Sequence, residues 1–186
     1  MKVYLGLVHH PIKNKKDELV TTSVTNLDIH DISRSCRTFG IKKYFIVTPF
    51  LAQTELVNEI LGHWEQDKAN AFNPDRQDAL AIAKVASSIE VAIDEITEIE
   101  GQRPLVVVTG ANFEKFNGST QDLTKKLQES NMPCLILFGT GWGLHQSALD
   151  MADYSLSPII SKNSDGYNHL SVRSAVAIYL DRLFGE

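Results

Sequence analysis

The fold is decided by the stretch Cys134-Leu135-Ile136-Leu137-Phe138-Gly139-Thr140-Gly141-Trp142-Gly143. Its continuous apolar run is typical of a parallel strand that is buried on both faces. The glycines that follow give access to backbone conformations that other residues rarely adopt, and they let main-chain N–H groups approach a ligand. The loop lacks the Lys and Ser/Thr of a P-loop and the spacing of a dinucleotide fingerprint. It is therefore either a plain tight turn or a ligand-binding loop of another kind.

Further strands and helices alternate with this one along the chain. Apolar runs at residues 3–8, 44–48 and 105–109 have the same character, and weaker strand candidates lie at 82–86 and 154–157. Between the runs, apolar residues recur every three or four positions, as on one face of a helix. These stripes are Ile29, Ile32, Cys36 and Phe39; Val57, Ile60, Leu61 and Trp64; Ile89, Ala92, Ile93, Ile96 and Ile99; and Val172, Ala175, Val176, Tyr179, Leu180 and Leu183. The alternation predicts one α/β domain over residues 1–186, with a mostly parallel sheet and helices on both faces.

Capping signals sharpen the helix boundaries. Ser88 and Ser119 are placed to cap helices, and Asp122 completes a capping box with Ser119. Gly40 and Gly101 stand where helices should end. The segments expected to be irregular are residues 11–26, 69–76 and 159–168.

Composition places the chain among ordinary globular proteins. Its 186 residues suit one domain, with 43% hydrophobic and 22% charged residues. No apolar run reaches the roughly 20 residues that cross a bilayer, and the first residues do not read as a signal peptide. Cys36 and Cys134 both lie in expected core segments and cannot form a disulfide framework. We therefore expect a soluble cytoplasmic protein.

The charges are unevenly distributed. The formal net charge is −5, yet residues 1–43 hold eight Lys or Arg and only four Asp or Glu. Such asymmetry would let one surface attract phosphates while the chain as a whole stays acidic. An enzyme for small molecules with two differently solvated faces would fit the same charges.

Two more segments could carry chemistry, and each has a structural alternative. Residues 167–175 lead into the last helix, where Asn168 or Ser171 could cap the helix or could help to hold a polar ligand. In the first helix, Asp31 and Arg34 are three residues apart on the solvent side, where such pairs usually form modest ion pairs. His9 and His10 are adjacent on a strand end and point in opposite directions, so we expect no metal site. The sequence also lacks the nucleophile elbow of serine hydrolases.

Taken together, these segments resemble the SPOUT superfamily of RNA methyltransferases. Residues 34–41 look like its first motif, an Arg followed by small residues and Phe-Gly. Residues 135–144 look like the second motif. Ile159-Ile160, together with residues 169–172, looks like the third. The order and spacing of the three are more specific than any one alone.

The resemblance implies a fold, a cofactor and an assembly. It implies a C-terminal trefoil knot over about residues 104–180, which ordinary topology rules would exclude. It also implies S-adenosylmethionine as cofactor and a homodimer that completes the active site. The implied cofactor contacts, largely through the backbone, are Thr109, Gly110, Phe138, Gly139, Thr140, Gly141, Gly143, Ile159, Ile160, His169, Leu170, Ser171 and Val172.

This chain departs from the ribose-methylating relatives at several positions. Asp28 and His30 stand where those relatives have Asn and Gly, and His169 replaces an Asn. The glycine loop also lacks the acidic residue common after it in those relatives and has Trp142 instead. The departures suggest a divergent branch, nearer to enzymes that methylate guanine N1 in transfer RNA.

The implied roles follow from the chemistry of methyl transfer. If guanine N1 is the acceptor, Asp165 or His169 is the candidate base, and if a ribose hydroxyl is the acceptor, Arg34 is. In either case we expect Arg34 to position the substrate. Phosphates of the RNA would meet Lys13, Lys15, Lys16, Lys42 and Lys43. The alternatives are a non-catalytic nucleotide-binding or scaffold protein and a small-molecule enzyme with a flavodoxin-like sheet.

Overall fold

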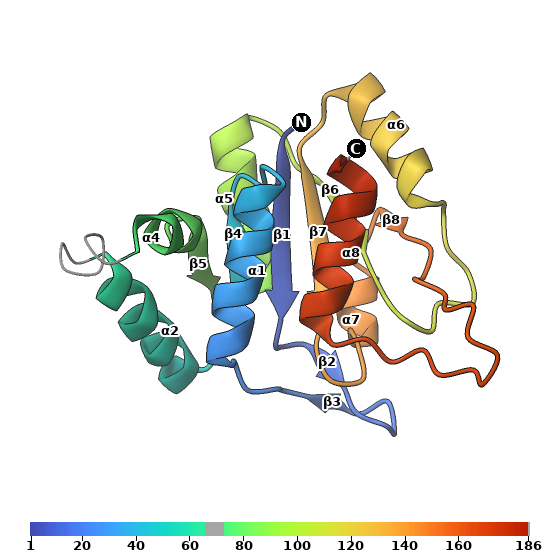
Figure 1. Ribbon diagram of the computed structural model, residues 1–186, viewed down its shortest axis with the longest axis horizontal. Helices are drawn as coiled ribbons and strands as arrows, with labels where there is room; N and C mark the ends of the chain where they lie inside the picture. The colour runs from blue at the N-terminus through green and yellow to red at the C-terminus, as the bar shows by residue number, and fades with distance from the viewer. Residues whose placement is uncertain (66–72, 186) are drawn as a thin grey trace.

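A six-stranded parallel sheet forms the centre of the protein, which we describe from a computed structural model over residues 1–65 and 73–185. The strand order is β5-β4-β1-β7-β6-β8, and every neighbouring pair is parallel (Figure 1). The strands of this sheet are β1 (Val3–Val8), β4 (Tyr44–Val47), β5 (Ala83–Ala86), β6 (Leu105–Val108), β7 (Cys134–Gly139) and β8 (Tyr154–Ser155). A separate antiparallel hairpin consists of β2 (Ile12–Lys13) and β3 (Leu19–Val20).

Helices cover both faces of the sheet. One face carries α1 (Asn26–Thr38), α2 (Leu51–Trp64), α4 (Pro74–Leu80), α6 (Thr120–Ser130) and α8 (Val172–Phe184). The other face carries α5 (Ile89–Glu100) and α7 (Gln146–Leu149). The expected α/β architecture with helices on both faces is thus confirmed. None of the helices in the described part of the chain is long and apolar enough to cross a membrane.

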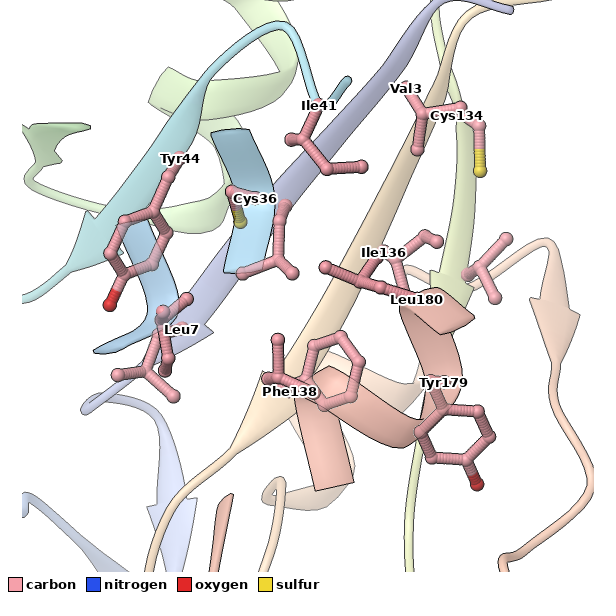
Figure 2. Packing of buried hydrophobic residues seen from close by; sticks show 14 of the residues in the cluster. Val3, Leu7, Cys36, Ile41, Tyr44, Cys134, Ile136, Phe138, Tyr179 and Leu180 are labelled. Atoms are coloured by element: carbon pink, nitrogen blue, oxygen red, sulfur yellow. The ribbon is translucent and has the colours of Figure 1, made fainter. Parts of the chain in front are cut away.

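The central strands contribute side chains to two hydrophobic clusters because successive residues point to opposite faces. Ile136 and Phe138 of β7 pack toward α1 and α8, whereas Leu135 and Leu137 pack toward α5. Figure 2 shows the first of these clusters, in which Tyr179 of α8 lies against Phe138. Burial of each such side chain stabilises the fold by roughly 1.5–3 kcal/mol.

Most of the helix boundaries expected from the sequence are confirmed. Ser88 accepts from the backbone N–H of Val91, and Ser119 and Asp122 form the full capping box. Gly101 ends α5 in the left-handed conformation, with φ +73°. These signals are local, since each cap joins residues within one turn of the helix end.

Two of the expected irregular segments contain regular structure. Residues 11–26 include the β2–β3 hairpin, and Pro74 begins α4, so residues 74–76 are helical. Residues 69–72 lie outside the described part of the chain. The segment 159–168 is without helix or strand, as expected.

The last helix does not cover the edge strand that precedes it. Although β8 lies at the end of the sheet, α8 packs against α1 near the centre and also against α6 (Figure 1). The segment 157–171 therefore runs from the edge of the sheet back toward its middle. It does so at the carboxyl ends of the strands, the edge at which open α/β sheets usually bind ligands.

Candidate functional site at the carboxyl edge

The glycine loop, residues 139–143, follows β7 and turns tightly. Gly141 and Gly143 have φ values of +57° and +105°, and the N–H of Gly143 donates to the carbonyl of Thr140 at 3.0 Å. A Cβ on Gly139 would lie 2.7 Å from the backbone nitrogen of Leu144. The loop therefore requires glycine at several positions, because its backbone doubles back on itself.

The β2–β3 hairpin fastens the glycine loop from one side. The N–H of Lys13 donates to the carbonyl of Gly143 at 3.0 Å, and that of His145 donates to the carbonyl of Pro11 at 3.2 Å. Ile12 is fully buried and forms a bridge with Leu144. The hairpin and the glycine loop thus form one rigid unit at the carboxyl edge.

A chain of polar side chains ties the same loop to β1. The hydroxyl of Thr140 donates to the carbonyl of Val8 at 3.0 Å and is also hydrogen-bonded to the hydroxyl of Thr22. Thr22 in turn lies 3.1 Å from Nδ1 of His9. His9 is completely buried, and among the described residues its Nε2 has no hydrogen-bond partner. Burial lowers the pKa of His9 to about 4, partly offset by the nearby Asp28 carboxylate, so the ring is neutral at physiological pH.

The loop after β6 is held just as firmly. The hydroxyl of Thr109 donates to the carbonyl of Leu137 at 2.9 Å, which joins β6 to β7 beyond the last strand residue. A Cβ on Gly110 would come within 2.6 Å of the ring of Phe113. The expected cofactor contacts in this loop are therefore backbone atoms of a fixed segment.

The long loop before α8 is closed by Asn168. Its side-chain amide donates to the carbonyl of Ile159 at 2.9 Å, and its oxygen accepts from the N–H of Ser161 at 3.1 Å. Ser171, and not Asn168, caps α8, accepting from the N–H of Ser174. The capping role considered for Ser171 is thus confirmed, and Asn168 instead brings the two ends of the loop together.

The two candidate bases on this loop are exposed. Asp165 accepts from the backbone N–H of Tyr167 at 2.8 Å, and the ring of His169 lies 5.3 Å from that of Tyr167. Ile160 and Leu170 are exposed as well, at 73% and 48%. Solvent therefore reaches this part of the expected site.

Arg34 lies in a groove between α1 and α8. The groove has a volume of about 590 Å³. Its lining is Asp31, Arg34, Ser35, Thr38, Phe39, Ser171, Arg173, Ser174 and Ala177. Serine hydroxyls and a guanidinium at the start of α8 thus face the same space as Arg34.

The ion pair considered between Asp31 and Arg34 does not occur among the described residues. Arg173 of α8 takes the place of Arg34, with its Nε 3.5 Å from a carboxylate oxygen of Asp31. Its Nη1 also donates to the buried carboxylate of Asp28 at 2.8 Å, and Thr25 donates to the other oxygen of Asp28. The Asp28–Arg173 pair joins residues 145 positions apart, so no local pattern could have revealed it.

The structure divides the expected phosphate-binding lysines between two edges of the sheet. Lys13, Lys15 and Lys16 follow β1 at the carboxyl edge, whereas Lys42 and Lys43 precede β4 at the amino edge. Lys43 is also paired with Glu95 at 2.6 Å. Only the first three can act together with the glycine loop.

Comparison with known proteins shows the family of the chain. The SAM-dependent RNA methyltransferase family matches residues 2–185. A "tRNA (guanine-N(1)-)-methyltransferase" of Oleidesulfovibrio alaskensis is 43% identical over 99% of this chain, but the chain spans only 42% of that relative. An uncharacterised protein of Aquifex aeolicus is 36% identical over 99% of the chain and 89% of its own length.

The fold comparison agrees with the family match. The SpoU methyltransferase AviRb of Streptomyces viridochromogenes, in complex with the cofactor AdoMet, superposes with a TM-score of 0.57 at 15% identity. The match covers 98% of this chain and 58% of AviRb. The RNA methyltransferase resemblance drawn from the motifs is confirmed by the family match, and the comparison with AviRb shows a shared fold.

Proposed function

Since this chain belongs to the family of SAM-dependent RNA methyltransferases, we propose that it methylates transfer RNA in the cytoplasm, as a single domain over residues 1–186. The observation that carries the proposal is the joint position of the glycine loop and the first turn of α8 at the carboxyl edge of the sheet (Figure 1). Both segments offer backbone groups in fixed positions.

The residues present at this edge fit the cofactor. A side chain on Gly139 would collide with the backbone of Leu144, and Gly141 has a positive φ that other residues rarely adopt, so this turn exposes backbone with no side chain at either position. The cofactor would be held by Thr109, Gly110, Phe138, Gly139, Thr140, Gly141 and Gly143, together with residues 159–160 and 169–172. When bound, S-adenosylmethionine supplies an electrophilic methyl group.

The acceptor we propose is N1 of a guanine in transfer RNA. The relatives that carry this activity in their names support it, although this chain spans less than half of their length. Guanine N1 must lose a proton during transfer, and the exposed side chains of Asp165 and His169 are the groups available to take it. Arg34 orients the acceptor nucleotide from the groove beside α8.

We further propose that two copies pair across α1 and α8, and that the chain is knotted over about residues 104–180. The open groove that contains Arg34 supports the pairing, because a second copy would enclose it. The knot is supported by the packing of α8 against α1, which requires segment 157–171 to return from the edge strand β8. Analytical ultracentrifugation tests the dimer. Pulling on both termini in optical tweezers tests the knot, since a knotted chain extends less than an open one.

The function is tested in two steps. Titration calorimetry should detect tight binding of S-adenosylhomocysteine, whereas NAD and FMN should not bind. Incubation with transfer RNA and S-adenosylmethionine, followed by nucleoside mass spectrometry, should then yield 1-methylguanosine. If the product is a ribose 2′-O-methylated nucleoside, guanine N1 is not the acceptor, but the assignment as an RNA methyltransferase still holds. If S-adenosylhomocysteine does not bind, a scaffold protein would be favoured instead.

A further inference from the structure

Trp142 projects from the glycine loop into solvent. Its side chain is 58% exposed, although tryptophan is on average a largely buried residue. Leu144 and Ile12 already fill the buried side of the loop. Packing against the core therefore does not explain why a tryptophan stands at position 142. A large aromatic ring is thus presented to solvent at the edge of the sheet where the cofactor and RNA are proposed to meet.

The backbone that carries this ring is unusually well fixed. Trp142 stands between Gly141 and Gly143, which both have positive φ, and the turn is closed by the hydrogen bond from Gly143 to Thr140. The hairpin holds the far side of the turn through Lys13. Little conformational entropy of the backbone would therefore be lost if a ligand stacked on the indole.

A positive charge lies near the exposed ring. Nζ of Lys15 lies 6.0 Å from the centroid of the indole, at the limit of a cation–π contact. Lys16, the next residue in the hairpin turn, is exposed, and among the described residues neither Lys15 nor Lys16 forms an ion pair. Lys13, in contrast, is neutralised by Asp17 at 2.6 Å. An exposed aromatic ring flanked by free lysines is the combination that single-stranded nucleic acid binds, with bases on the ring and phosphates on the cations.

We propose that Trp142 is a stacking platform for an unpaired nucleobase of the RNA substrate and that Lys15 and Lys16 hold the phosphates next to that base. This rests on the proposed function, because it assumes that the chain binds RNA. The charges favour RNA over the adenine of the cofactor as the occupant, since S-adenosylmethionine has a net positive charge whereas every nucleotide of RNA carries a negative phosphate. A duplex would not fit, because its bases already stack on one another.

Intrinsic fluorescence tests the stacking directly. In a Trp64→Phe variant the indole of Trp142 is the only fluorophore of its kind, and a single-stranded oligouridylate should quench it, whereas an RNA duplex of equal length should not. Iodide should quench the same signal in the free protein. Protection from iodide would overturn the proposal, because it would mean that another part of the protein or a second copy covers the ring.

Binding of transfer RNA gives the second test. Trp142→Ala should weaken it about 10- to 100-fold, and Trp142→Phe should restore most of the loss, because an aromatic ring is retained. Lys15→Ala should weaken it less. Ile99→Ala, which removes an exposed apolar side chain at the amino edge, is the matched control and should change nothing.

The affinity for S-adenosylhomocysteine separates this inference from the proposed function. It should be the same in Trp142→Ala as in the unaltered protein. If cofactor binding falls with the substitution, Trp142 contacts the cofactor and the proposal is wrong. Unchanged RNA binding in Trp142→Ala would also overturn it, while the methyltransferase assignment would stand. If the unaltered protein binds no S-adenosylhomocysteine, the proposed function fails independently.

Discussion

Two buried side chains near the carboxyl edge differ in whether they carry a charge. His9 is buried and uncharged, whereas Asp28, on the helix that follows the hairpin, is buried as a charge and depends on Arg173. An uncharged imidazole tolerates a site without solvent, but an isolated carboxylate does not. Protonation of His9 should therefore destabilise the fold, whereas Asp28 should destabilise it when the carboxylate and Arg173 no longer pair.

The first prediction concerns the pH dependence of stability. The pKa of His9 is about 4 in the fold and about 6.5 in an unfolded chain, so the unfolded state binds more protons between these values. Stability contributed by neutral His9 is complete above pH 6.5 and is lost as the pH falls toward 4, by about 3 kcal/mol in all. Urea unfolding at several pH values should show this slope. His9→Gln should flatten it, and an equal slope in that variant would refute the assignment.

The second prediction concerns the Asp28–Arg173 pair. Asp28→Ala should lower the free energy of unfolding by roughly 2–4 kcal/mol, because it leaves the guanidinium without its buried partner and also removes the hydrogen bond from Thr25. Asp31→Ala is the control on the same helix. Its carboxylate is half exposed and 3.5 Å from Arg173, so its loss should cost less than about 1 kcal/mol. Equal losses in urea unfolding would contradict the distinction.

The third prediction assigns a function to Arg34. Arg34→Ala should lower turnover on transfer RNA on the order of 100-fold or more, because the acceptor is no longer aligned. Affinity for S-adenosylhomocysteine should be nearly unchanged, since the cofactor is bound by the loops. Arg37 lies on the same helix as Arg34 and forms an exposed ion pair with Asp78 of α4. Arg37→Ala, which removes this pair, should retain turnover. Loss of turnover in both variants would show that substitutions disturb α1 as a whole and that Arg34 has no specific role.

At the scale of elements, the structure separates glycines that the loop needs from one that only weakens a helix. Gly139 has backbone atoms within reach of any added Cβ, whereas Gly62, inside α2, has none among the described residues within 4 Å. A glycine in a helix costs stability through backbone entropy alone.

The fourth prediction follows from this contrast. Gly139→Ala should weaken S-adenosylhomocysteine binding on the order of 10-fold, because the turn must open to make room for the Cβ of the alanine. Gly62→Ala should leave binding unchanged and raise the free energy of unfolding by about 0.5–1 kcal/mol. Calorimetry and urea unfolding measure the two effects. Undiminished binding in Gly139→Ala would exclude this loop as the cofactor cradle.

Elements were predictable from the sequence wherever their signals are local. The buried strands and the caps at Ser88 and Ser119 follow from short patterns, and the structure has them in those places. The β2–β3 hairpin did not follow, because its strands have two residues each and are ordered by the glycine loop more than a hundred residues later. The same holds for Arg173, whose partner Asp28 is brought to it only by the packing of α8 on α1.

At the scale of the whole molecule, the polarity of a parallel sheet decides which charges can act together. All strands of the central sheet point the same way, so residues that follow one of them and residues that precede one lie at opposite edges. The five lysines expected to bind phosphates, which appear as one feature in the sequence, are therefore two separate groups in space. Lys15 and Lys16 belong to the edge with the glycine loop, and Lys42 belongs to the other.

The fifth prediction uses this division. Each phosphate contact contributes about 0.7–0.9 to the slope of log affinity against log salt concentration. The double variant Lys15→Ala, Lys16→Ala should therefore bind transfer RNA more weakly at low salt and show a slope smaller by about 1.5. Lys42→Ala changes the net charge by one unit in the same direction, yet it should leave both quantities unaltered because its side chain projects from the amino edge. If the slope falls by equal amounts per lysine in the two variants, RNA is held by the overall field of the protein, and the carboxyl edge is not the binding surface.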